Sequence, residues 1–163
     1  MSTKKLVLCG LLTGIVTVLT LIVIPLPISN GYVNLGDAGV LLAANMIGGV
    51  WGMLCAGIGS LLADLILGFA VYAPATFLIK ASAAGISVLL YKRLKGGYRF
   101  LALLIGALAV PVGYFLFEGA FVLNSFAAAA VNLPFNALQA LLGAVLGFAL
   151  LNVAQRVYPE SKA

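Results

Sequence analysis

Two residues of opposite charge, Asp64 and Lys80, lie inside apolar runs of one stretch, AGIGSLLADLILGFAVYAPATFLIK. The two runs meet at the break GFAVYAP. At a rise of about 1.5 Å per residue, both charges fall roughly 8–9 Å below the same end of a helical hairpin. A charge inside a membrane span costs at least about 2.5–3.5 kcal/mol, so it normally faces a partner or a wet cavity. Asp64 and Lys80 therefore form an ion pair that locks the hairpin, contact a polar ligand, or do both.

Further polar residues lie towards the same end of the predicted helices. Asp37 begins one apolar run, where the helix dipole also favours an acid, and Glu118 ends another. Asn132, Asn136 and Gln139 occupy the first third of the last run. Each amide alone is equally explained by a hydrogen bond to a neighbouring helix. Because the whole set is confined to one depth, the pattern favours a shallow ligand cavity over a continuous pore.

The composition is that of an integral membrane protein. Of the 163 residues, 64% are hydrophobic and only 8% are charged, against about 25% charged in soluble domains. The apolar runs predict one domain over residues 1–163. Its expected spans are about 6–24, 37–50, 54–69, 74–91, 100–117 and 133–157. We predict an all-α integral membrane protein, a six-transmembrane-helix bundle with an outward-facing ligand cavity.

Two details of these spans concern the short connections. Trp51 and Gly52 indicate an interfacial break between the second and third spans, because Trp is favoured at that depth. The mildly apolar residues 118–131 form either a helical extension or a re-entrant loop.

Lysine and arginine are distributed asymmetrically between the predicted loops. Eight of the nine share one side: Lys4, Lys5, Lys92, Arg93, Lys95, Arg99, Arg156 and Lys162. The opposite loops, 25–36, 70–73 and 118–131, contain none. This pattern predicts a multi-pass protein of the cell membrane with both termini in the cytoplasm. It also explains the net charge of +5 without any binding of nucleic acid.

The residues argue against an enzyme or a metal protein. Histidine is absent, which removes the usual general base and the commonest metal ligand. Cys9 and Cys55 lie in apolar runs and are interpreted as small buried hydrophobic residues. No G-x-x-x-x-G-K-[ST] or H-E-x-x-H pattern occurs, so neither ATP binding by a P-loop nor metalloprotease chemistry is expected. An outward cavity without an energy source indicates a binding subunit that needs a motor. A stand-alone channel for a small solute and a membrane enzyme acting on lipid are the alternatives.

The segment GYVNLGDAGVLLAANMIGGVWGMLCAGIGSLLADLILGFAVYAPATFLIKA resembles the substrate-binding S components of energy-coupling factor (ECF) transporters. The opening KKLVLCGLLTGIVTVLT and the late NLPFNALQALLGAVLG extend the resemblance over most of the chain. The order N-L-G-D, A-D-L and Y-A-P-A-T-F-x-I-K is its most specific part. The chain is most similar to the branch for small heteroaromatic vitamins or precursors. Hydroxymethylpyrimidine and pyridoxine are favoured, with riboflavin in the same group.

The resemblance implies a six-helix membrane protein that captures its vitamin at the outer side. It implies assembly with a transmembrane T component and two ATPase subunits, which bind the ATP that drives uptake, so this chain itself carries no cofactor. Gly10 and Gly14 match the family's small-xxx-small motif, which meets the T component. The loop 25–36 is expected to act as a lid.

We take eight residues as candidates for the vitamin site. They are Asn34, Asp37, Asp64, Tyr72, Lys80, Glu118, Asn136 and Gln139. Their carboxylates and amides are suited to bonding ring nitrogens and hydroxyls. Tyr32 and Tyr72 flank the expected mouth from different loops, where they either stack on a flat ring or sit at the membrane interface.

Overall fold

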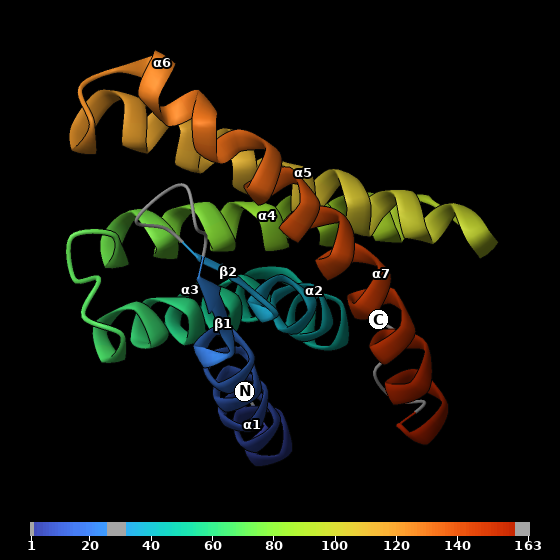
Figure 1. The fold of residues 1–163 in the computed structure, drawn as a ribbon. Helices are drawn as coiled ribbons and strands as arrows, with labels where there is room; N and C mark the ends of the chain where they lie inside the picture. Colours follow the sequence, from blue (N-terminus) through green and yellow to red (C-terminus); the bar gives the residue numbers. More distant parts are fainter. Residues whose placement is uncertain (1, 26–31, 159–163) are drawn as a thin grey trace.

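The computed structural model describes residues 2–25 and 32–158 (Figure 1). Its long helices are α1 (Thr3–Leu21), α2 (Gly36–Ile47), α3 (Gly49–Ile66), α4 (Ala73–Arg93), α5 (Arg99–Phe117) and α7 (Leu133–Val157). Strand β1 (Val23–Pro25) pairs antiparallel with β2 (Tyr32–Asn34). The structure therefore confirms the prediction of an all-helical bundle, with one short hairpin added. Residues 26–31, which make up most of the loop 25–36 expected to act as a lid, and the side chain of Tyr32 lie outside the described part of the chain.

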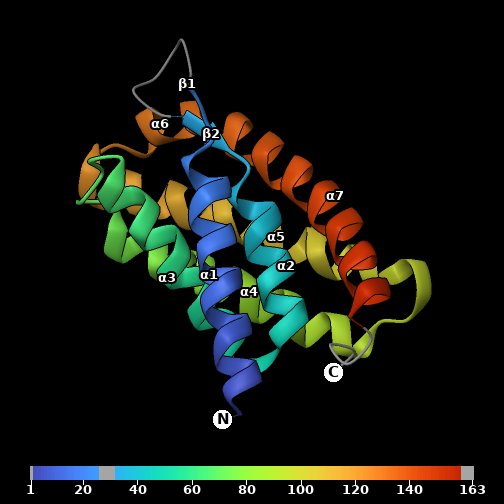
Figure 2. The ribbon, with the colours of Figure 1, turned by 90° about the horizontal axis from the view of Figure 1, so that it is seen from below.

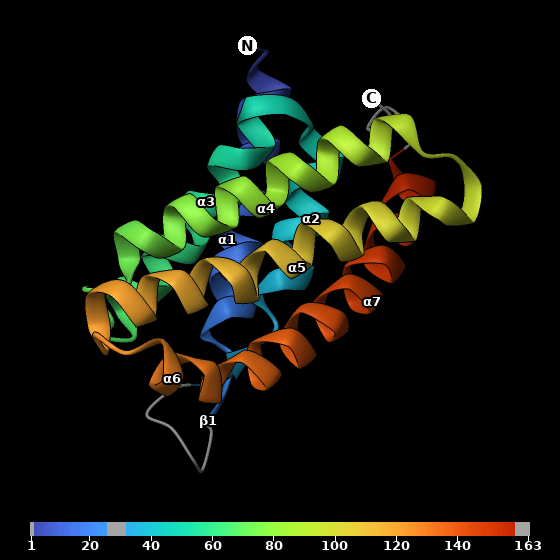
Figure 3. The same cartoon turned by 90° about the horizontal axis from the view of Figure 1, so that it is seen from above.

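Helix α2 lies at the centre of the bundle. It packs against α1, α3, α4 and α7, and all twelve of its residues are buried. Figure 2 shows α1 beside α2, and Figure 3 shows α4, α5 and α7 side by side. The other five long helical stretches are long and apolar enough to cross a membrane. A helix of twelve residues is too short for this, but every residue of α2 is buried against other parts of the chain.

The break between α2 and α3 differs from the prediction. It falls at Gly48 and Gly49 rather than at Trp51-Gly52, so α3 begins five residues earlier than the expected span at 54. Gly48 has a φ of +71° and Gly49 a φ of +56°, a left-handed region that glycine enters without steric cost. Trp51 lies in the first turn of α3 and Gly52 packs on the backbone of Ala44. The sequence IGGVWG contains glycines at both Gly48-Gly49 and Gly52. The break falls at Gly48-Gly49, because these are the two with positive φ angles.

The connection between α5 and α7 is a helical extension, which decides between the two alternatives for residues 118–131. Helix α5 continues as a π-helix over Glu118–Val122. The short helix α6 (Phe126–Ala129) and a 3₁₀ turn (Ala130–Asn132) then lead into α7. Ser125 caps α6, since its hydroxyl accepts a hydrogen bond from the Ala128 N–H at 3.3 Å.

The two ends of the bundle carry different residues. Figures 2 and 3 show both chain ends and the α4–α5 connection at one end, with the β hairpin and α6 at the other. Lysine and arginine of α1, of the α4–α5 connection and of α7 gather at the first end. The buried acids Asp37, Asp64 and Glu118 lie in elements near the second.

Cysteine labelling tests which end faces the cytoplasm. In a Cys9→Ala, Cys55→Ala background, we expect Val71→Cys to react in intact cells with an impermeant thiol reagent and Lys95→Cys to react only after permeabilisation. Both positions are exposed, so accessibility within the protein does not limit either reaction. Lys95 is expected on the cytoplasmic side because lysine and arginine are in excess at its end of the bundle. Labelling of Lys95→Cys in intact cells would reverse the expected orientation.

Candidate vitamin-binding site

A buried ion pair joins α2 to α4. Asp37 lies in the first turn of α2, and Lys80 lies about two turns into α4. The Lys80 Nζ is 2.5 Å from the Asp37 Oδ1, and the two side chains are only 2% and 1% exposed. Removing one partner of such a pair leaves an uncompensated charge and costs about 3–5 kcal/mol. The pair therefore fixes α2 against α4.

Gln139 of α7 and Asn34 of β2 extend this ion pair into a hydrogen-bond network. The Gln139 Nε2 donates to the second oxygen of Asp37 at 2.9 Å, and the Gln139 Oε1 accepts from the Asn34 N–H at 2.8 Å. The side chain of Asn34 accepts from the Gly36 N–H at 2.7 Å, which holds the start of α2. Four of the eight candidates, here called the polar anchor, thus form one network: Asn34, Asp37, Lys80 and Gln139.

The absence of a side chain at Gly143 allows α7 to approach Asp37. A methyl group added at this position would overlap the Cβ of Asp37. Gly143 lies one turn beyond Gln139, so the same face of α7 supplies both the hydrogen bond and the space.

The partner of Lys80 differs from the prediction. We expected Asp64, because it lies at the matching depth of the adjacent helix, and the structure instead pairs Lys80 with Asp37. The physical reason is the central position of α2, which brings an acid 43 residues away into contact with α4. Asp64 is also buried, at 3% exposure on α3. It lies within electrostatic reach of Tyr72 and Tyr114.

Two residues beside Lys80 were not among the eight candidates for the vitamin site. The hydroxyls of Thr76 and Tyr114 are 2.9 Å apart, and the Lys80 Nζ lies 5.6 Å from the centroid of the Tyr114 ring. An ammonium over a ring face is attracted by the ring quadrupole. The spacing of Thr76 four residues before Lys80 was the available signal, since both share one face of a helix. Tyr114 is a single tyrosine within an apolar run, and no such spacing marks it in the sequence.

Tyr72 precedes α4 and carries an aromatic contact on either side. Its ring lies 5.6 Å from that of Phe117 and 6.2 Å from that of Phe69, both edge to face. Burial, and then the carboxylates of Glu118 and Asp64, raise the pKa of Tyr72 above its usual value. Its phenol therefore stays protonated at neutral pH and is a hydrogen-bond donor.

Glu118 and Asn136 lie on the α5–α7 side of this region. Glu118 is buried, and its Oε2 accepts from the Asn132 Nδ2 at 2.9 Å. Asn136 is half-buried, one turn before Gln139 on α7, and its side chain makes no hydrogen bond to another described residue. Asp64, Tyr72, Tyr114, Glu118 and Asn136, here called the polar rim, are the side chains of this end that the anchor does not use.

The ionisable side chains of this end are mainly hydrogen-bond acceptors. Within residues 2–25 and 32–158, no group of three or more His, Cys, Asp or Glu side chains could hold a metal ion. Among the described residues, this end of the bundle holds three buried carboxylates and one buried ammonium, that of Lys80. The region is therefore richer in acceptors than in donors.

The deeper part of the bundle also contains polar contacts, whereas the sequence analysis placed the polar set at one depth. The Asn45 Nδ2 donates to the Ser87 Oγ at 2.9 Å, between α2 and α4. The Tyr91 hydroxyl donates to the Gln155 Oε1 at 3.3 Å, between α4 and α7. All four residues are buried, so each of these polar groups finds its partner on a neighbouring helix.

Gly10 and Gly14 lie on the outer surface of α1. Both are exposed, and a methyl group added at either would meet no other atom within 4 Å. They therefore do not serve packing within this chain.

Comparison with known proteins identifies the family of this chain. A relative from Pyrococcus woesei, described as an uncharacterized protein in a gap 3' region, is 33% identical over 135 residues, which cover 81% of this chain and 88% of that protein. Residues 1–156 match the family described as ECF-type riboflavin transporter, S component. The chain belongs to this family of S components, which makes it a multi-pass membrane subunit of a vitamin transporter.

Proposed function

We propose that this chain captures a small heteroaromatic vitamin or precursor at the end of the bundle formed by the β hairpin and α6. A T component and two ATPase subunits then drive its uptake. The observation that carries the proposal is the gathering of three buried carboxylates, one buried ammonium and several amides and phenols at that end. Buried ionisable groups within a membrane bundle are costly, and a ligand site is their usual reason.

The charge balance supports a ligand that is rich in hydrogen-bond donors. The anchor already satisfies Asp37 and Lys80 with each other. Glu118 of the rim is buried and accepts one hydrogen bond through its Oε2, from Asn132, so its carboxylate is the acceptor that we assign to a ligand. Ring N–H, amino and hydroxyl groups match such acceptors, and Tyr72 with its neighbouring rings suits a flat ring. Hydroxymethylpyrimidine, pyridoxine and riboflavin all combine a flat heteroaromatic ring with hydroxyl donors. Riboflavin is tested first because the family is described by it.

A binding panel tests the ligand. Isothermal titration of the purified chain with riboflavin, pyridoxine and hydroxymethylpyrimidine should give saturable one-to-one binding for one of the three. Glu118→Gln and Tyr72→Ala should each weaken that binding by about 10–100-fold, since each removes a partner from a desolvated site. Phe121→Ala, at a ring that is 76% exposed, is the matched control and should bind as the wild type does. Binding of none of the three, by a folded protein, would contradict the proposed ligand class.

A double-mutant cycle separates the structural from the ligand-binding role of the anchor. Lys80→Met and Asp37→Asn should each lower the thermal unfolding temperature in detergent, because each leaves its partner unpaired. The double variant should recover most of that loss. If its ligand affinity recovers as well, the pair is structural, and if affinity stays low, Lys80 or Asp37 contacts the ligand.

The control cycle for this experiment pairs Lys80→Met with Glu118→Gln. Glu118 is bonded to Asn132 rather than to Lys80, so the two losses of stability should add. Additive losses in the Asp37 cycle too would show that the Asp37–Lys80 pair does not form.

Substitutions on α1 test assembly with the T component. Gly10→Leu and Gly14→Leu should reduce co-purification with the T component and leave vitamin affinity unchanged, because both positions face away from the bundle. Ala149→Leu, at an exposed position of α7, is the matched control and should assemble normally. Loss of vitamin affinity in the glycine variants would instead connect α1 to the binding site.

A further inference from the structure

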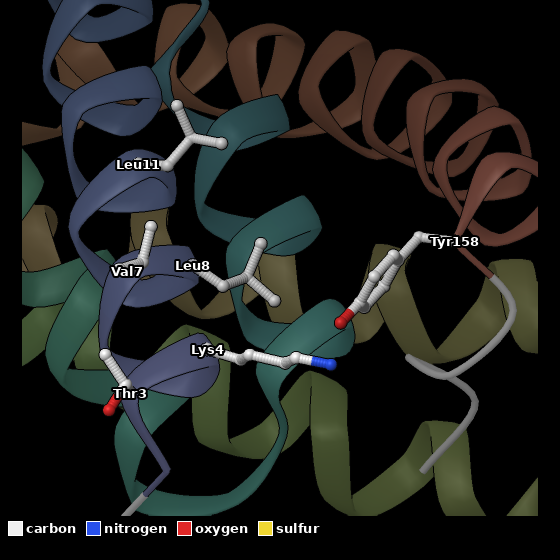
Figure 4. Close-up of a pocket in the computed structure, with 6 residues that line it drawn as sticks. All are labelled: Thr3, Lys4, Val7, Leu8, Leu11 and Tyr158. Atoms are coloured by element: carbon white, nitrogen blue, oxygen red, sulfur yellow. The ribbon is translucent and has the colours of Figure 1, made fainter.

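A groove lies between α1 and the end of α7, at the basic end of the bundle. It encloses about 390 Å³ and is lined by Thr3, Lys4, Val7, Leu8, Leu11 and Tyr158. Figure 4 shows Lys4 and Tyr158 reaching towards each other across the space between the two elements, with Leu8 and Leu11 farther along α1. The groove is at the opposite end of the bundle from the polar anchor.

The lining changes from polar to apolar along the helix axis. Thr3 and Lys4 begin α1, while Leu11 lies seven residues on, roughly 10 Å deeper at 1.5 Å per residue. Val7 and Leu11 are 66% and 60% exposed. A polar mouth above apolar walls matches a molecule with a charged head and a hydrocarbon chain.

The positive charge at the mouth of the groove favours a negatively charged headgroup. Lys4 lines it directly, and Lys5 and Arg156 lie on the adjoining ends of α1 and α7. The acids among the described residues, Asp37, Asp64 and Glu118, are all buried near the other end. The first turn of α1 also has N–H groups without intrahelical acceptors, which favour an anion at this point.

The groove overlaps the glycine face of α1 only in part. At 3.6 residues per turn, the line Lys4, Leu8 and Leu11 lies about 100° around the helix from Gly10 and Gly14, whereas Thr3 and Val7 lie on the same side as the glycines. A subunit seated on the glycines would therefore leave the Lys4, Leu8 and Leu11 side of the groove open to lipid.

We propose that this groove binds one phospholipid with an anionic headgroup, from the leaflet on the basic side. Its phosphate lies between Lys4 and Tyr158, and the start of an acyl chain lies along Leu8 and Leu11. Basic pockets between membrane helices bind anionic headgroups in this way, each cation contributing on the order of 1 kcal/mol near the surface.

Native mass spectrometry of the purified chain, with equal phosphatidylglycerol and phosphatidylcholine, tests the proposal. The wild type should retain one phosphatidylglycerol in preference to phosphatidylcholine. Lys4→Gln should lower phosphatidylglycerol retention by about fivefold, the effect of one cation. Leu11→Gln should lower retention of both lipids. Lys95→Gln, an exposed cation outside the groove, is the matched control and should retain lipid as the wild type does.

Three results would overturn the proposal. Equal losses in Lys4→Gln and Lys95→Gln would indicate a diffuse surface charge instead of a site. Displacement of the lipid by an excess of inorganic phosphate would indicate a phosphate site without a role for the acyl chain. Release of the lipid on adding the T component would make the groove a subunit interface.

Discussion

The buried ammonium of Lys80 is paired with a carboxylate, and the need for that partner governs how the helices meet. The carboxylate comes from α2, so α2 must lie directly against α4. Asp37 has a second oxygen to satisfy, and Gln139 does so from α7. Gly143 must then lack a side chain, or α7 would be held away from Asp37. One buried ion pair therefore sets the relative placement of three helices.

The location of the polar residues could be predicted from the sequence, but their pairing could not. Charges inside apolar runs reveal their depth, because a fixed rise per residue converts sequence position into height. Depth alone does not identify the partner, and Asp64 was favoured only because its helix is the neighbour of α4 in the sequence. The buried central position of α2 depends on packing against four other helices, which no local pattern records. Gly48 was missed for a related reason, since its positive φ follows from how α2 and α3 must turn.

The seam between α2, α4 and α7 is held by two kinds of interaction. Near the β hairpin it is ionic, through Asp37 and Lys80. Deeper in the bundle it is neutral, through the hydrogen bonds from Asn45 to Ser87 and from Tyr91 to Gln155. Single polar residues such as these have no periodicity that a sequence can show, and only the packed helices reveal which of them meet. The same three helices are therefore bonded to one another at several depths.

Helix α1 lies outside this seam but close to Asp37, the acid of the buried ion pair. It packs against α2 and α3, and its outward face presents Gly10 and Gly14 without contacts in this chain. The side chain of Thr20, at the other end of α1, touches Gly36 so closely that a methyl group there would overlap it. Gly36 directly precedes Asp37. The glycine face of α1 that we propose as the partner surface and the buried Asp37 of α2, held by Lys80 and Gln139, therefore lie on neighbouring helices, joined by the contact of Thr20 with Gly36.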